Sequence, residues 1–257
     1  MTIEIGPNLF KRALAEGKPQ IGFWSNLSSA LVIDLLSDCG YDWLLLDSEH
    51  SPVEVPDTFN MLLAADRSSV TTPVVRPSWN DPVMFKKLLD IGARSILVPM
   101  VQTAEEAARA VAATRYPLDG MRGVAGSIRA SRYGRITDYH TKAVDDICVL
   151  LQIESQQGLD NLEAIAETDG VDGVFIGPAD LGAALGYVAN RNDPAVIDAI
   201  KQANKRIRAI GKPTGILTAD PVQGQMWLDE GFSFVAVGID TVILAKGADA
   251  LAKQFGK

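Results

Sequence analysis

Two carboxylates lie where apolar runs of the sequence end. Glu154 follows the run I-C-V-L-L-Q-I, and Asp180 follows the run G-V-F-I-G-P-A. Both runs are short and rich in branched aliphatic residues, as is typical of buried parallel strands. Residues 159–167 have helical spacing, so both acids are expected at one edge of a sheet. Such a pair holds a divalent cation, or one acid stays protonated; the alternative is two acids that are solvated or paired with Lys or Arg.

Other polar residues also follow strand-like runs. The motif L-D-S-E-H-S-P contributes Asp47, Glu49 and His50, V-V-R-P contributes Arg76, and L-L-Q-I-E contributes Gln152. A (β/α)₈ barrel draws its catalytic groups from the ends of several strands, all at one face. The sequence therefore predicts an active site there. Singly, each residue has a structural explanation: His50 could end a helix, and Arg76 could pair with Asp47 or Glu49.

Strand-like and helix-like segments alternate along the chain. Strands are predicted at residues 21–25, 43–47, 72–76, 95–99, 147–153, 173–176, 213–217 and 234–238. Helices are predicted at residues 29–37, 57–65, 81–91, 104–114, 159–167, 194–210, 221–230 and 241–254. Eight such units predict an α/β fold, a (β/α)₈ TIM barrel formed as one domain by residues 1–257, with a doubly wound open sheet as the alternative.

One segment, residues 116–143, breaks this alternation. It is rich in Gly and Arg and has no clear period. A loop of this length in a compact domain is usually functional or part of an interface. His140 lies within it and is expected to be solvated.

Composition narrows the class of protein. The formal net charge of −8 excludes nucleic acid and an anionic membrane surface as expected partners. No membrane helix is expected, because no apolar stretch is long enough, and no secretory signal is expected, because residues 1–12 lack a basic segment followed by an apolar one. Cys39 and Cys148 lie in apolar runs and are predicted to be core thiols. A reducing compartment, the cytoplasm, is therefore expected.

The chain resembles the HpcH/HpaI aldolase family of metal-dependent class II pyruvate aldolases. The matching motifs are G-F-W-S-N-L, Y-D-W-L-L-L-D-S-E-H-S-P, P-V-V-R-P, L-D-I-G-A-R-S-I-L-V-P-M-V, T-R-Y-P-L-D-G-M-R-G-V, L-L-Q-I-E-S and F-I-G-P-A-D-L. The resemblance implies a barrel that reversibly cleaves 4-hydroxy-2-oxo acids to pyruvate and a small aldehyde without an organic cofactor. It also implies a homo-oligomer, a hexamer built as a dimer of trimers, in which the last helix packs on a neighbouring subunit.

The resemblance also implies roles for individual residues. Glu154 and Asp180 would ligate Mg²⁺, Mn²⁺ or Co²⁺, His50 would be the catalytic base, Asp90 the acid that raises its basicity, and Arg76 the group that stabilises the transition state. One departure is Ser48, where many relatives are expected to have Gly. The expected substrate contacts are Gln152 and Ala179 from the resemblance, and Trp24, Gly177, Pro178, Asp180 and Leu217 from their places at strand ends. Asp47 and Glu49 are expected to support the site.

The expected chemistry suits these residue types. Loss of a methyl proton from pyruvate places negative charge on the ketone oxygen, which a chelated metal and a fixed arginine stabilise. A histidine can move the proton of the aldehyde-derived hydroxyl. Schiff-base aldolases instead need a desolvated lysine at a strand end, and the sequence has none there, so the class I route is rejected.

Two alternatives remain at this point. A CoA-thioester lyase of the citrate/malyl type would use the same metal site, but it should be larger and carry a basic surface for CoA. A non-catalytic oxo-acid-binding protein would not need both His50 and Arg76. The acceptor aldehyde is left open among succinic semialdehyde, glycolaldehyde, hydroxypyruvate and sugar-derived aldehydes.

Overall fold

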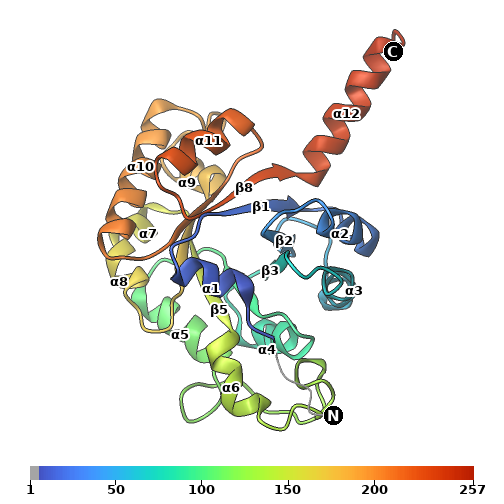
Figure 1. Ribbon diagram of the computed structural model, residues 1–257. Helices are drawn as coiled ribbons and strands as arrows, with labels where there is room; N and C mark the ends of the chain where they lie inside the picture. The colour runs from blue at the N-terminus through green and yellow to red at the C-terminus, as the bar shows by residue number, and fades with distance from the viewer. Residues whose placement is uncertain (1–5) are drawn as a thin grey trace.

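The computed structural model describes residues 6–257. At its centre, eight parallel strands follow one another in sequence order and close into a barrel (Figure 1). Their bounds are β1 (Gln20–Ser25), β2 (Trp43–Asp47), β3 (Thr72–Arg76), β4 (Ser95–Val98), β5 (Cys148–Ile153), β6 (Gly173–Ile176), β7 (Thr214–Leu217) and β8 (Phe234–Ile239). The predicted TIM barrel is confirmed. The open sheet is wrong, because β1 pairs with β8.

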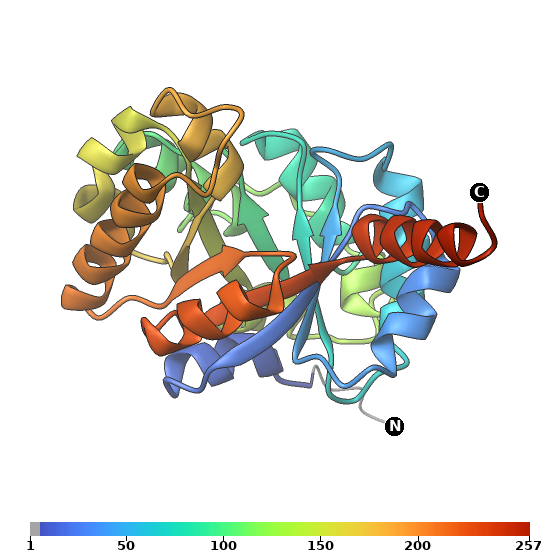
Figure 2. The same cartoon turned by 90° about the horizontal axis from the view of Figure 1, so that it is seen from above.

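Helices surround the barrel, as the view from above shows (Figure 2). Their bounds are α1 (Leu9–Ala15), α2 (Ala30–Ser37), α3 (Val55–Ala65), α4 (Pro82–Asp90), α5 (Ala104–Thr114), η1 (Arg129–Ser131, a 3₁₀ helix), α6 (Tyr139–Asp146), α7 (Gln156–Asp160), α8 (Leu162–Ala166), α9 (Pro178–Ala184), α10 (Pro194–Ala209), α11 (Pro221–Asp229) and α12 (Asp240–Gln254). Ser29, Asp81, Thr103 and Asp220 accept backbone hydrogen bonds as N-caps, which sets where four of them begin.

The inside of the barrel forms a core of its own. Aromatic side chains fill the barrel interior, where Phe10 of α1 contacts the rings of Trp43 and Phe234. Trp43 and Phe234 begin their strands, so α1 closes the amino-terminal end of the barrel. The opposite, carboxyl-terminal end is left open for a site.

The structure corrects three sequence-based expectations. The predicted helix at residues 159–167 is two short helices that meet at Asn161, whose amide donates to the carbonyl of Gln102 (2.8 Å). His140 lies on α6 with its ring against Tyr116 and its Nε2 3.2 Å from the carbonyl of Ala125 in an exposed contact, so it is only partly solvated. Cys39 is exposed at the end of α2, whereas Cys148 is buried as predicted.

The last helix projects away from the barrel (Figure 1). Its first residue, Asp240, is buried and accepts hydrogen bonds from the hydroxyl of Ser25 and the backbone N–H groups of Asn26 and Leu27. After Asp240 the helix is almost wholly exposed, including its apolar side chains. Within residues 6–257, no helix is long and apolar enough to cross a membrane.

Candidate active site

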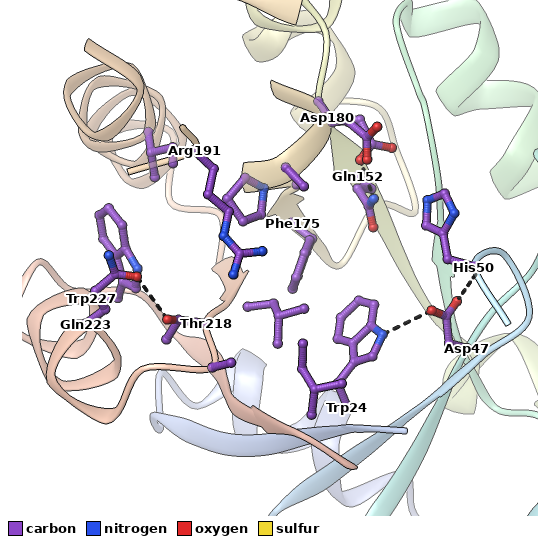
Figure 3. Close-up of a pocket in the computed structure, with 18 of the residues that line it drawn as sticks. Trp24, Asp47, His50, Gln152, Phe175, Asp180, Arg191, Thr218, Gln223 and Trp227 are labelled. Atoms are coloured by element: carbon purple, nitrogen blue, oxygen red, sulfur yellow. Dashed lines mark hydrogen bonds between the residues drawn. The ribbon is translucent and has the colours of Figure 1, made fainter. Parts of the chain in front are cut away.

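A cavity of about 200 Å³ opens where the strands end, at the carboxyl-terminal face of the barrel (Figure 3). It brings together most of the residues selected from the sequence. Those that line it are Trp24, Asp47, His50, Arg76, Gln152, Glu154, Gly177, Pro178, Ala179, Asp180 and Leu217. Glu49 stands behind Arg76, and Asp90 lies elsewhere.

Arg76 is held rigidly at one side of the cavity. Because β2 and β3 place Asp47 beside Arg76 in register, the two side chains form a bidentate pair, Nε to Oδ1 at 2.9 Å and Nη2 to Oδ2 at 2.6 Å. Nη1 lies 2.8 Å from Oε2 of Glu49. The guanidinium also stacks 4.6 Å from the ring centre of Trp24, whose indole N–H donates to Asp47 (3.1 Å). These contacts fix the orientation of the Arg76 guanidinium, so it cannot rotate freely.

The two carboxyl groups that contact Arg76 have pKa values shifted in opposite directions. Burial raises the pKa of Asp47, but the hydrogen bonds and charge of Arg76 outweigh it, so the pKa is lowered overall. Burial raises the pKa of Glu49 to about 7; Arg76 opposes this rise, and the charges of Glu154, Asp47 and Asp180 add to it. One arginine therefore faces more negative charge than it neutralises.

Glu154 is buried and fixed beside the cavity. Its Oε1 accepts from the backbone N–H of Met100 (2.9 Å), and its Oε2 accepts from the amide of Gln152. Burial, with a smaller contribution from the charge of Asp180, raises the pKa of Glu154 despite these hydrogen bonds. A side chain at Gly177 would place its Cβ 2.3 Å from Oε2, so only glycine permits this close approach.

This donor set fits a hard divalent cation. Glu154 and Asp180 share the cavity, and the amide oxygen of Gln152 is buried without a hydrogen-bond partner among the described residues. No group of three or more His, Cys, Asp or Glu side chains suited to a metal occurs within residues 6–257. Mg²⁺ and similar ions often bind through one or two protein carboxylates, with water and substrate completing the coordination.

His50 and Asp90 are separated within the chain. His50 lies after β2, its side chain is 61% exposed, and its ring points toward the part of the cavity that holds Asp180 and Gln152 (Figure 3). Its Nε2 lies 4.0 Å from Oε1 of Glu49. Asp90 ends α4 and accepts a hydrogen bond from Arg122 (2.8 Å). The structure therefore does not bring Asp90 to His50 in a single subunit.

The cavity also contains polar residues that the sequence analysis did not select. Arg191 and Asn192 come from the connection between α9 and α10, and Gln223 comes from α11. Gln223 accepts from the hydroxyl of Thr218 (3.0 Å) and donates to Asn192 (3.1 Å). These residues could have been predicted from the sequence because they lie in the connections that follow β6 and β7, and such connections form the catalytic face of a barrel.

Comparison with known proteins agrees with this geometry. The family model of the HpcH/HpaI aldolase/citrate lyase family matches residues 20–246. The 4-hydroxy-2-oxo-heptane-1,7-dioate aldolase of Salmonella dublin is 52% identical over 250 residues, 97% of this chain and 95% of that protein.

Solved structures agree as well. A HpcH/HpaI aldolase/citrate lyase family protein of Burkholderia cenocepacia J2315 has a TM-score of 0.91 at 34% identity, covering 97% of this chain and 100% of that one. Citrate synthase SbnG has a TM-score of 0.83 at 26% identity, covering 96% of this chain and 98% of its own. The chain belongs to the HpcH/HpaI aldolase/citrate lyase family, as its motifs predicted.

Proposed function

We propose that this protein is a divalent-metal-dependent class II aldolase that reversibly cleaves 4-hydroxy-2-oxo acids to pyruvate and an aldehyde. The observation that carries the proposal is the carboxylate pair of Glu154 and Asp180 in one cavity with the rigid guanidinium of Arg76. Relatives named as aldolases support it. Among the described residues that line the cavity, none is a lysine, which is consistent with rejection of the Schiff-base route.

Glu154 and Asp180 would hold Mg²⁺, Mn²⁺ or Co²⁺. When bound, the cation supplies Lewis acidity to the carboxylate and ketone oxygens of a 2-oxo acid. Gln152 orients Glu154 through its amide N–H, and its own amide oxygen is buried without a hydrogen-bond partner among the described residues. Gly177, Pro178 and Ala179 form the adjoining wall.

Arg76 would stabilise the charge that develops during cleavage. The C3–C4 bond of the substrate breaks, its electron pair forms the C2–C3 double bond as the ketone π pair moves to the C2 oxygen, and the aldehyde leaves. Protonation of the resulting enolate at C3 by water gives pyruvate. Because two carboxylates hold the guanidinium in place, Arg76 needs no reorganisation as that oxygen becomes negative. Trp24 and Leu217 bound the space where the rest of the substrate lies.

His50 would accept the proton of the C4 hydroxyl, directly or through one water, and return it during condensation. We assign Asp90 to raising the basicity of a histidine in a neighbouring subunit. This assignment follows from the family resemblance, because within one subunit Asp90 pairs with Arg122 instead.

We further propose that the protein is a cytoplasmic hexamer, a dimer of trimers. The exposed apolar side chains of α12 support an intersubunit role for this helix, since Ile243, Leu244 and Leu251 are 58%, 61% and 60% exposed. Two cysteines that form no disulfide fit a reducing compartment.

Deuterium exchange at the methyl group of pyruvate, followed by NMR in D₂O, tests the proposal. An aldolase exchanges these protons in a metal-dependent manner without CoA, a thioester lyase does not, and a binding protein never does. We expect exchange to stop in EDTA and to be lost in the Glu154→Gln and Asp180→Asn variants, both still folded. Glu163→Gln is the control, because that acid pairs with Arg206 outside the cavity. Wild-type turnover of either ligand variant in EDTA would show that the ligands are wrongly assigned.

A further inference from the structure

The cavity has opposite charge character at its two sides. Asp47, Asp180 and Gln152, whose amide bonds Glu154, lie at one side (Figure 3), where the metal and the oxo-acid group are proposed to bind. Arg191 lies across from them, and its guanidinium points toward the middle of the cavity (Figure 3). A substrate that spans the cavity therefore meets carboxylates at one end and a cation at the other.

Arg191 differs from Arg76 in having an unused charge. The guanidinium of Arg76 is already paired with Asp47 and Glu49. Among the interactions of residues 6–257, none is an ion pair or hydrogen bond of the Arg191 guanidinium. Arg191 is thus the cation in this cavity that is available to a ligand anion.

The backbone that carries Arg191 is held in place on two sides. A Cβ atom built on Gly182 of α9 would lie 3.4 Å from Cα of Arg191, so the connection packs closely on that helix. Asn192 is bonded to Gln223 of α11 (3.1 Å), and Asp193 caps α10 by accepting from the N–H of Ala195 (3.0 Å). These contacts hold the backbone of Arg191 in place beside the cavity, which lowers the conformational entropy lost when its side chain binds a ligand.

The wall between the two charged sides is largely apolar. Phe175 lies between Arg191 and the carboxylates (Figure 3), and Leu217 and Ile239 also line the cavity. A short chain of methylene groups can lie against such a wall without losing hydrogen bonds, whereas a polyhydroxylated chain would leave hydroxyl groups unpaired.

We propose that Arg191 determines substrate specificity by binding a terminal carboxylate of the acceptor aldehyde, which selects short aliphatic aldehyde acids over neutral aldehydes. The inference rests on the proposed aldolase function and adds the chemical class of the second substrate. The oxo-acid carboxylate occupies the metal side, so a second carboxylate needs a second cation, and Arg191 supplies it.

The test compares two aldehydes of similar length as acceptors for pyruvate: succinic semialdehyde, which ends in a carboxylate, and butanal, which ends in a methyl group. The measured quantity is the ratio of their kcat/KM values. A charge-assisted hydrogen bond is worth about a 10- to 100-fold change in binding, so Arg191→Gln should lower this ratio by about 10- to 100-fold. Arg191→Lys should retain part of the preference because it keeps the charge but loses the fork.

The matched control is Arg109→Gln, which removes an exposed cation from α5, outside the cavity. It should keep the wild-type ratio. An unchanged ratio in Arg191→Gln, or an equal loss with both aldehydes, would overturn the assignment of Arg191. Pyruvate methyl exchange separates this failure from that of the proposed function: its absence in the wild-type protein contradicts the aldolase itself, whereas its presence with an unchanged ratio overturns only Arg191.

Discussion

Arg76 is both a member of a buried ion-pair network and the group proposed to stabilise the transition state. Its carboxylate partners Asp47 and Glu49 use all three of its nitrogens, so its position is set before substrate binds. That arrangement also means that the guanidinium carries little net positive charge of its own into the cavity. Its proposed contribution therefore depends on position and on hydrogen-bond direction as much as on charge.

Replacement of Arg76 tests that contribution. We expect Arg76→Ala to slow both aldol cleavage and pyruvate methyl exchange by about a hundred- to a thousandfold, the usual loss for one preorganised stabilising group. Arg76→Lys should restore little, because an ammonium cannot reproduce the planar fork. Steady-state kinetics and NMR exchange measure the two reactions. Loss of cleavage with unchanged exchange would place Arg76 at the aldehyde rather than at the pyruvate unit.

Asp47 tests the structural side of the same pair. Asp47→Asn removes the charge from the bidentate hydrogen bonds to Arg76 and leaves Glu49 as the ion pair of that arginine. The free energy of unfolding should therefore fall by about 1.5–3 kcal/mol near neutral pH. The folded-state pKa of Asp47 lies below its ordinary value of 3.8. Its carboxylate therefore stabilises the fold above that value, and the contribution is lost as the pH falls through the lower folded-state pKa.

Urea denaturation of both proteins at pH 7 and at pH 3 measures this difference. We expect the gap between wild type and Asp47→Asn to be large at pH 7 and smaller at pH 3. Asp220→Asn is a control, because that acid caps α11 by accepting from the N–H of Val222 and lies away from Arg76. A gap that stays constant with pH would rule out the Asp47 charge as its source.

The sequence predicted which residues at the strand ends line the cavity, but it did not predict those contributed by the loops. Glu154, Asp180 and Arg76 were recoverable because each follows an apolar run whose end fixes its place in a barrel. Arg191 was missed because its place depends on how one connection packs on Gly182 and bonds to Gln223, contacts that have no local signature. The Arg122–Asp90 pair joins two segments in the same way.

Among the elements, the strands were predicted to within one residue because their residues are buried on both faces. Helix α1 was missed for a physical reason. It has seven residues, too few to be stable alone, and its apolar side chains Phe10 and Leu14 are stabilised only by the barrel that they close. Helix α6 was missed inside the irregular segment, since its buried residues Tyr139 and Ala143 are few.

Because α1 closes the amino-terminal end of the barrel, it should contribute to the free energy of unfolding without taking part in catalysis. Phe10 is fully buried against Trp43 and Phe234, at the barrel end away from the cavity. Phe10→Ala should lower the free energy of unfolding by about 3–5 kcal/mol through lost burial and the cavity that remains. Leu9→Ala, at a side chain that is 44% exposed, should change it by much less. Chemical denaturation measures both variants, and equal losses would contradict the closing role.

For the whole molecule, the barrel is complete in one chain, whereas the proposed catalytic residues His50 and Asp90 are not brought together in it. Asp90 lies away from His50, and α12 leaves the barrel with its apolar face exposed. Both features have the same explanation if subunits associate: a neighbour covers the helix, and a neighbour brings an acid to the histidine. The sequence predicted the helix and its apolar residues, but a single chain contains no partner against which to place them.

The exposed face of α12 is where this assembly can be tested. Leu244 and Leu251 lie on the same side of the helix and are 61% and 60% exposed. A buried leucine contributes about 1.5–3 kcal/mol. A double Leu244→Glu, Leu251→Glu variant should therefore dissociate the proposed hexamer, because it would bury two unpaired charges at the contact. Lys253→Glu, on the opposite side, adds negative charge without touching that face and should remain assembled. Light scattering at micromolar concentration reads the mass directly, and a wild-type protein that scatters as a monomer would contradict the hexamer.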